Sequence, residues 1–225
     1  MMLSLLIPLL AACAPSADTG ALETGAVSAG QEVWVLLDWI DTETSIDAGW
    51  MVSFSVELLP CQESAGLSLV PVARAGHGLT GEETLRQLRA PRVESLTART
   101  QSQLGHLTPN AGSYCELFYL TSFTTAVYDS VGLPDEIDMV GDALSLFVER
   151  SGRRLAAHSG YGVKRTIVDA NGDPDPLEIT DDGSAALLRL YRDVSVLDMV
   201  RSTDADVATS MLASLAESTV VVREH

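Results

Sequence analysis

A series of short segments with alternating apolar and polar residues constrains the fold more than any other feature. Val52–Cys61 begins with apolar residues at every second position, and Leu144–Val148 repeats the alternation. This period of two is typical of a strand with one buried face. Further strands are predicted at Val33–Trp39, Leu67–Ala73, Tyr114–Phe123, Tyr161–Val168, Leu187–Tyr191 and Thr219–Arg223. Gly, Pro and Asp separate them, so we expect a mainly β fold, an immunoglobulin-like or jelly-roll-like β-sandwich.

One amphipathic helix is predicted near the C-terminal end, over Asp204–Glu217. Its apolar face consists of Val207, Met211, Leu212 and Leu215. Thr203 is the expected capping residue, with Asp206 three positions later. Glu82–Leu88 is a second, shorter helical segment of one or two turns, which Pro91 limits.

The first residues have the character of an export signal. Met1–Leu10 is apolar but too short for a membrane-spanning helix, which needs about 20 residues. The following Leu10-Ala11-Ala12-Cys13 resembles the lipobox of bacterial lipoproteins, in which the leader is removed and the cysteine becomes the acylated N-terminus. The resemblance implies a signal peptide over residues 1–12 and a lipid, palmitate among its chains, on Cys13. Ala14 favours the outer membrane as its destination.

Two further regions follow the predicted signal. Residues 13–31 comprise the lipidated cysteine and a stretch rich in Ala, Ser, Gly and Thr, which predicts a flexible tether. Fully extended, the 18 residues after Cys13 span about 60 Å. Residues 32–225 are long enough for one β-sandwich domain with a sizeable core.

The net charge of −17 restricts the possible partners. Nucleic acids and anionic lipids need clustered Lys and Arg, so we expect neither as a partner. The membrane is an expected partner through the N-terminal lipid alone, and an unknown protein or small ligand is the other. The expected location is the cell envelope, in the periplasm or at the cell surface.

Three cysteines occur in the chain. With Cys13 lipidated, Cys61 and Cys115 remain, and an even remainder in an exported protein favours a structural disulfide. No Cys-x-x-Cys spacing indicates a reactive pair.

An acidic segment is the first candidate for a metal site. Calcium prefers oxygen ligands, and side-chain oxygens occur at alternate positions in Asp169, Asn171, Asp173 and Asp175. The segment departs from an EF-hand because Gly172 comes too early in the loop. The alternative is a solvated hairpin between Thr166–Val168 and Leu177–Ile179, for which Asn171-Gly172 is a suitable turn.

Other candidate residues are more scattered. Copper is the alternative metal, with the histidines His77, His106 and His158 as candidate ligands. Three tryptophans lie close together near the start of the domain, in the core or along a ligand cleft: Trp34, Trp39 and Trp50. His158-Ser159 precedes Gly160, but this is not the Gly-x-Ser-x-Gly motif of hydrolases.

Three stretches resemble a group of known proteins. Asp47–Phe54, Ala111–Tyr114 and Leu187–Val200 look like segments of uncharacterised β-rich lipoproteins of predatory and soil Gram-negative bacteria. More remotely, they resemble copper-binding lipoproteins associated with methanobactin, which implies a lipid anchor and a β-sandwich. Tyr191 stands where that resemblance suggests a histidine. From the lipobox-like sequence and the lack of a recognisable catalytic motif, we expect a lipid-anchored binding or structural protein without catalytic activity. The alternatives are a metal-binding lipoprotein and an unrecognised hydrolase.

Overall fold

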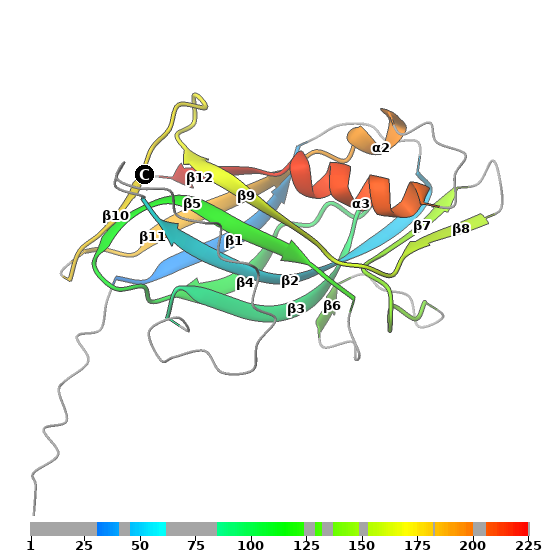
Figure 1. The fold of residues 1–225 in the computed structure, drawn as a ribbon, viewed down its shortest axis with the longest axis horizontal. Coiled ribbons are helices and arrows are strands. Elements are labelled where there is room, and N and C mark those ends of the chain that lie inside the picture. Colours follow the sequence, from blue (N-terminus) through cyan, green and yellow to red (C-terminus); the bar gives the residue numbers. More distant parts are fainter. Residues whose placement is uncertain are drawn as a thin grey trace, which may run out of the picture.

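The twelve described strands form one mixed sheet that curls over on itself, so that its two parts, which we call the first and second sheets, face each other. Two short helices lie at one end of them (Figure 1). The computed structural model describes residues 31–40, 46–61, 85–123, 129–131, 137–148, 153–181, 183–199 and 206–224. The fold is mainly β with one C-terminal amphipathic helix, as predicted.

The first sheet has the strand order β4-β1-β11-β12. Its strands are β1 (Val33–Trp39), β4 (Ser102–Leu107), β11 (Ala186–Arg192) and β12 (Val220–Glu224). β1 and β11 run parallel, from Val33 opposite Ala186 to Trp39 opposite Arg192. The other two pairings are antiparallel.

The second sheet has the order β9-β5-β2-β3-β6. β10 pairs with β5, while β7 pairs with β2 and β8. Its strands are β2 (Ala48–Pro60), β3 (Gln87–Ser95), β5 (Gly112–Thr121), β6 (Asp129–Val131), β7 (Leu144–Val148), β8 (Arg153–Ala157), β9 (Tyr161–Val168) and β10 (Leu177–Ile179).

Two contacts close the sandwich along its sides. On one side, β12 pairs with β9 at two positions, Val221 opposite Ile167 and Val222 opposite Val168. On the other side, β3 and β4 lie next to each other without forming a ladder. The amide of Thr108 donates to the carbonyl of Leu85 at 3.0 Å across this boundary, and Arg92 donates to the carbonyl of Gln103. The interior is therefore enclosed on both sides.

The alternating direction of side chains along each strand explains the core. Every second residue of β1 is buried, because successive side chains of a strand point to opposite faces. Val33, Val35 and Leu37 meet side chains of the second sheet and of α3 in one apolar core. Each fully buried side chain of this size contributes roughly 1.5–3 kcal/mol to folding. A smaller cluster forms around β2 and β3 from Trp50, Val52, Val93 and Met139.

Two helices follow β11: α2 (Val196–Met199) and α3 (Val207–Glu217). α3 packs against β7, β8 and β9, as Figure 1 shows. Its buried residues include all four of the predicted apolar face. The predicted cap is wrong, because the helix begins at Val207 and Asp206, not Thr203, occupies the N-cap position. The Asp206 side chain makes no capping hydrogen bond.

One other local prediction differs from the structure, and one is untested. In Glu82–Leu88 only Leu85 is helical among the described residues, and β3 begins at Gln87. Pro91 has no backbone N–H to donate to a neighbouring strand. It is tolerated in β3 because it lies at a bulge, where the register with β2 shifts between Ser53 and Ser55 and no donor is needed. The predicted strand Leu67–Ala73 lies outside the described residues. None of the helices in the described part of the chain has the length and apolar character needed to cross a membrane.

Candidate functional site

A charged cluster lies between the two sheets. Arg192 of β11 is fully buried, and its Nη1 donates to Oε2 of Glu94 on β3 at 3.0 Å. Its Nη2 donates to the phenolic oxygen of Tyr119 on β5. One guanidinium from the first sheet therefore binds two side chains of the second.

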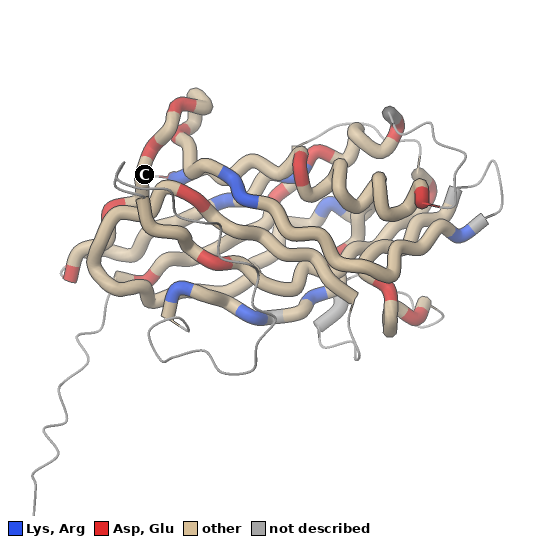
Figure 2. The backbone as a smooth tube through the Cα atoms, viewed as in Figure 1, with Lys and Arg blue, Asp and Glu red and all other residues tan. Residues whose placement is uncertain are grey.

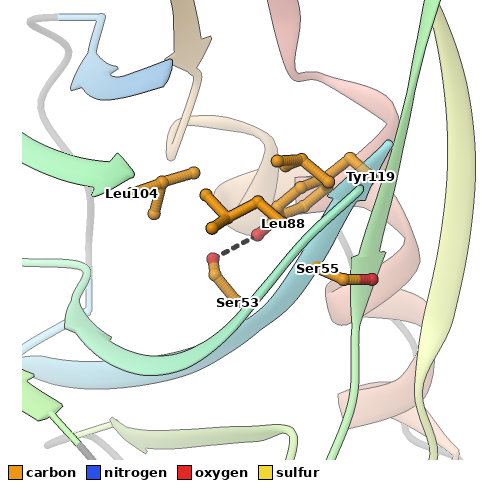
Figure 3. Close-up of a pocket in the computed structure, with 6 residues that line it drawn as sticks. Ser53, Ser55, Leu88, Leu104 and Tyr119 are labelled. Atoms are coloured by element: carbon orange, nitrogen blue, oxygen red, sulfur yellow. Dashed lines mark hydrogen bonds between the residues drawn. The ribbon is translucent and has the colours of Figure 1, made fainter. Parts of the chain in front are cut away.

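Aromatic and hydroxyl groups complete the cluster. The guanidinium carbon of Arg192 lies 5.3 Å from the ring centroids of both Trp39 and Tyr119, within the range of cation–π attraction. Ser53 forms a hydrogen bond with the Tyr119 hydroxyl, the dashed line in Figure 3. These contacts compensate Arg192 for part of its lost hydration.

Burial governs the protonation of the cluster. It raises the pKa of Glu94 above its ordinary value, although Arg192 opposes the shift. Burial also raises the pKa of Tyr119 to about 12, again against the effect of Arg192. Tyr119 is therefore a neutral donor and acceptor near pH 7 and not a phenolate nucleophile.

Several buried polar atoms near the cluster lack a hydrogen-bond partner within the described residues. They are Ser55 Oγ, Glu94 Oε1, Ser102 Oγ and Arg192 Nε. Two small spaces lie beside them. Figure 3 shows the first, which is lined by Ser53, Ser55, Val56, Leu88, Leu104 and Tyr119.

Both spaces are small. Trp39, Glu94 and Ser102 are among the residues lining the second. Each space has room for about one water molecule, far less than an ordinary ligand pocket. The cluster therefore joins the two sheets through its own side chains.

A second feature is the outward surface of three strands of the first sheet, β1, β11 and β12, which we call the outer face. It consists of Trp34, Leu36 and Asp38 on β1, Leu187, Arg189 and Tyr191 on β11, and Val220, Val222 and Glu224 on β12. All except Val220 are half-buried, and Val220 is 42% exposed. Trp34 also contacts His106 of β4, with the ring centroids 5.1 Å apart.

Arg189 is the only cationic residue of the outer face as defined. Its Nε and Nη2 donate to the two carboxylate oxygens of Glu224 at 2.6 and 2.9 Å. Its Nη1 donates to Asp38 at 2.7 Å. These carboxylates raise the pKa of Arg189 above its ordinary value. The three charged groups together carry a net charge of −1. The other six residues of the outer face are apolar or aromatic.

The predicted disulfide is present between Cys61 and Cys115, with its Cα atoms 4.7 Å apart. Cys61 follows the end of β2, and Cys115 lies in the neighbouring strand β5. Ser113 Oγ lies 3.1 Å from Cys61 Sγ and donates to Glu178 at 2.6 Å. The bond therefore joins two adjacent segments of the second sheet.

The acidic segment forms a tight loop after β9. Oδ1 of Asp169 accepts hydrogen bonds from the amides of Asn171 and Asp173, and its Oδ2 accepts from the Asn171 side chain. These bonds, first that from Asp173, hold the pKa of Asp169 below its ordinary value. Gly172 has a φ of 89°, which glycine adopts without strain. Asp175 lies near Arg223, with Nη1 to Oδ1 at 3.4 Å.

The predicted strand pairing around this loop is wrong. Val168 and Pro174 form an isolated bridge, but β10 pairs with β5, not with β9. Figure 2 shows the acidic residues of the loop projecting at one end of the molecule. Within the described part of the chain, no three His, Cys, Asp or Glu side chains gather as possible metal ligands.

The tryptophans and histidines are dispersed. Trp39 is in the main core and Trp50 in the smaller cluster, while Trp34 lies on the outer face. His158 is exposed, and its Nδ1 lies 2.8 Å from Asp142, which also binds Arg154. His77 and Cys13 lie outside the described residues.

Comparisons with protein-family models, curated proteins and solved structures gave no match to this chain.

Sequence patterns did not indicate the charged cluster. Arg192 and Glu94 are 98 positions apart, and nothing local distinguishes them from surface residues. The outer face had a partial signal, because β1 is apolar at positions of both faces, a pattern typical of a strand covered on both sides.

Proposed function

We propose that this chain is a lipid-anchored protein of the cell envelope, whose β-sandwich binds a partner or ligand and catalyses no reaction. The Cys61–Cys115 disulfide is the observation that carries the proposal. Disulfides persist in oxidising compartments such as the periplasm and the cell surface. Since the chain has three cysteines, the bond leaves only Cys13, the last residue of the lipobox-like sequence, for lipidation.

The charged interior is arranged as a structural element. The Arg192 cluster combines charged and hydroxyl groups, but its side chains are buried and the spaces beside them hold about one water molecule each. Its groups bind each other across the sheets, which suits a structural element. A ligand that leaves this interior intact would bind on the surface.

Metabolic labelling of the full chain in a Gram-negative host tests the anchor. We expect labelled palmitate in the membrane fraction for the natural chain and none for Cys13→Ser. The double variant Cys61→Ser/Cys115→Ser is the matched control, because it loses two cysteines and keeps Cys13. It should remain labelled. Label on Cys13→Ser, or an unlabelled natural chain, would refute the proposal.

A further inference from the structure

The second small space beside the charged cluster lies at the boundary between β3 and β4. Among the residues that line it are Arg92 and Glu94 of β3, Ser102 of β4 and Trp39 of β1. β3 and β4 lie next to each other but share no ladder. The two sheets must therefore be joined here by side chains or by a bound molecule.

Two oxygen atoms of residues that line this space have no hydrogen-bond partner among the described residues. They are Oε1 of Glu94 and Oγ of Ser102, and both are closed to solvent. The other carboxylate oxygen of Glu94 accepts from Arg192 at 3.0 Å. Ser53 also interacts with this carboxylate, but Oε1 itself forms no hydrogen bond. Because an unpaired buried polar atom is unfavourable, and a charged one more so, both oxygens need a partner.

The size of the space limits what this partner can be. The space has room for about one water molecule. Ordinary ligand pockets have volumes of about 300–1,000 Å³, so a sugar, a nucleotide or a peptide side chain does not fit. The occupant must be a single small molecule or ion.

The charges around the space disfavour an ion. Arg92 lines the space, and the guanidinium of Arg192 binds Glu94 and lies 5.3 Å from the centroid of the Trp39 ring. These two guanidinium groups repel a cation, and the carboxylate of Glu94 repels an anion. A neutral molecule meets neither repulsion. Water is neutral, donates to a carboxylate and either donates to or accepts from a hydroxyl.

We propose that the second space binds one ordered water molecule, which bridges Glu94 Oε1 and Ser102 Oγ. The water donates to the carboxylate oxygen and accepts the hydrogen of the Ser102 hydroxyl. Glu94 belongs to the second sheet and Ser102 to the first, so the water links the sheets where β3 and β4 share no ladder. This inference goes beyond the proposed function and does not depend on the lipid anchor.

A crystal structure of the full chain, at a resolution that locates ordered water, tests the site directly. We expect one well-ordered water within hydrogen-bond distance of both Glu94 Oε1 and Ser102 Oγ. An empty space, an ion in the same place, or a protein group bonded to either oxygen instead of the water would overturn the proposal.

The indole N–H of Trp39 reports on the same water in solution. Trp39 Nε1 donates to the carbonyl of Thr100 at 3.3 Å, and both residues line the space. A water held inside the protein tumbles with it and gives a nuclear Overhauser effect opposite in sign to that of surface water. We expect this effect between water and the indole N–H of Trp39. Its absence would contradict the proposal.

Two substitutions of Ser102 separate its hydrogen bond from its shape. Ser102→Thr keeps a hydroxyl, and Ser102→Val has nearly the same shape as that variant but lacks the hydroxyl. We expect Ser102→Thr to retain the Overhauser effect at Trp39 and Ser102→Val to lose it. Ser55→Ala is a second control, because Ser55 lines the first space and its hydroxyl also has no partner among the described residues. It should leave the effect unchanged. An effect that persists in Ser102→Val would show that Ser102 does not hold the water.

Discussion

Arg192 and Glu94 extend toward each other from strands of different sheets, and their ion pair is closed to solvent. Such a pair adds little net stability over apolar residues of similar size, because both ions lose their hydration. Once present, however, each charge depends on the other. We therefore expect the pair to fix the relative position of the two sheets while adding little to the net free energy of unfolding.

Loss of one partner should be costly. Glu94→Gln removes the counter-charge of the buried guanidinium, and we expect it to lower the free energy of unfolding by about 3–5 kcal/mol. Urea unfolding measures the change. Glu57→Gln is the matched control, since Glu57 pairs with Arg86 in a partly exposed salt bridge at 3.5 Å. Its effect should be at most about 1 kcal/mol.

A double variant measures the coupling between Glu94 and Arg192. Combining Glu94→Gln with Arg192→Met removes both charges and should cost less than the sum of the single changes. Additive losses would show that the two residues act independently, contrary to the geometry.

Tyr119 should give stability an alkaline limit. Its folded pKa of about 12 lies above the ordinary value of 10, so folding favours the protonated phenol. This contribution is complete below pH 10 and is lost as the pH rises from 10 to 12, by about 3 kcal/mol in all. Tyr119→Phe should lack this part of the decline. Parallel pH profiles of the two proteins would contradict the assignment.

The disulfide should stabilise the fold mainly through the unfolded chain. Cys61 and Cys115 are 54 positions apart, and loop-closure entropy then gives about 4 kcal/mol. We expect Cys61→Ser/Cys115→Ser to unfold at lower temperature than the oxidised parent. The parent should behave like the variant after reduction. In Cys13→Ser, denatured but not reduced, thiol titration should find no free thiol, and two thiols would contradict the bond.

The acidic loop should act as a turn in the absence of metal. Asp169 accepts two backbone amides, so Asp169→Ala should lower the unfolding midpoint equally in EDTA and in calcium. Because its folded pKa is lowered, this contribution is present above the ordinary pKa of 3.8 and disappears as the pH falls through the folded value. A midpoint that rises with calcium, and does not rise in Asp173→Ala, would instead establish the calcium site.

Strands that alternate, or that form a short apolar or β-branched run, were predictable from local pattern. Val33–Trp39, Leu144–Val148 and Tyr161–Val168 have the predicted bounds in the structure. β3 and β4 were missed because they do not alternate. β3 contains Arg89, Pro91 and Arg92, and β4 contains Gly105 and His106. Their strand conformation comes from pairing with β2 and β1, which tertiary structure supplies.

The local sequence could not predict which strands pair with each other, because tertiary structure also determines the pairing. β10 follows β9 in sequence yet pairs with β5, and the short alternating segment Leu177–Ile179 suits either neighbour. The charged cluster depends entirely on such pairings. Arg192 becomes buried only because β11 lies between β1 and β12, with its last residue directed into the core.

The arrangement of β1 has a consequence for the order in which the chain acquires its structure. β1 pairs in parallel with β11, with Val33 opposite Ala186. More than half of the sequence lies between these two residues, so β1 cannot form this pairing until that part of the chain is present. Both sheets are joined through β12. Such distant pairings make assembly slow. If the chain is exported as proposed, the first strand crosses the membrane and remains without its parallel neighbour until transport is nearly complete. During that interval, an early attachment at the N-terminus would hold the growing chain at the place where it finally folds.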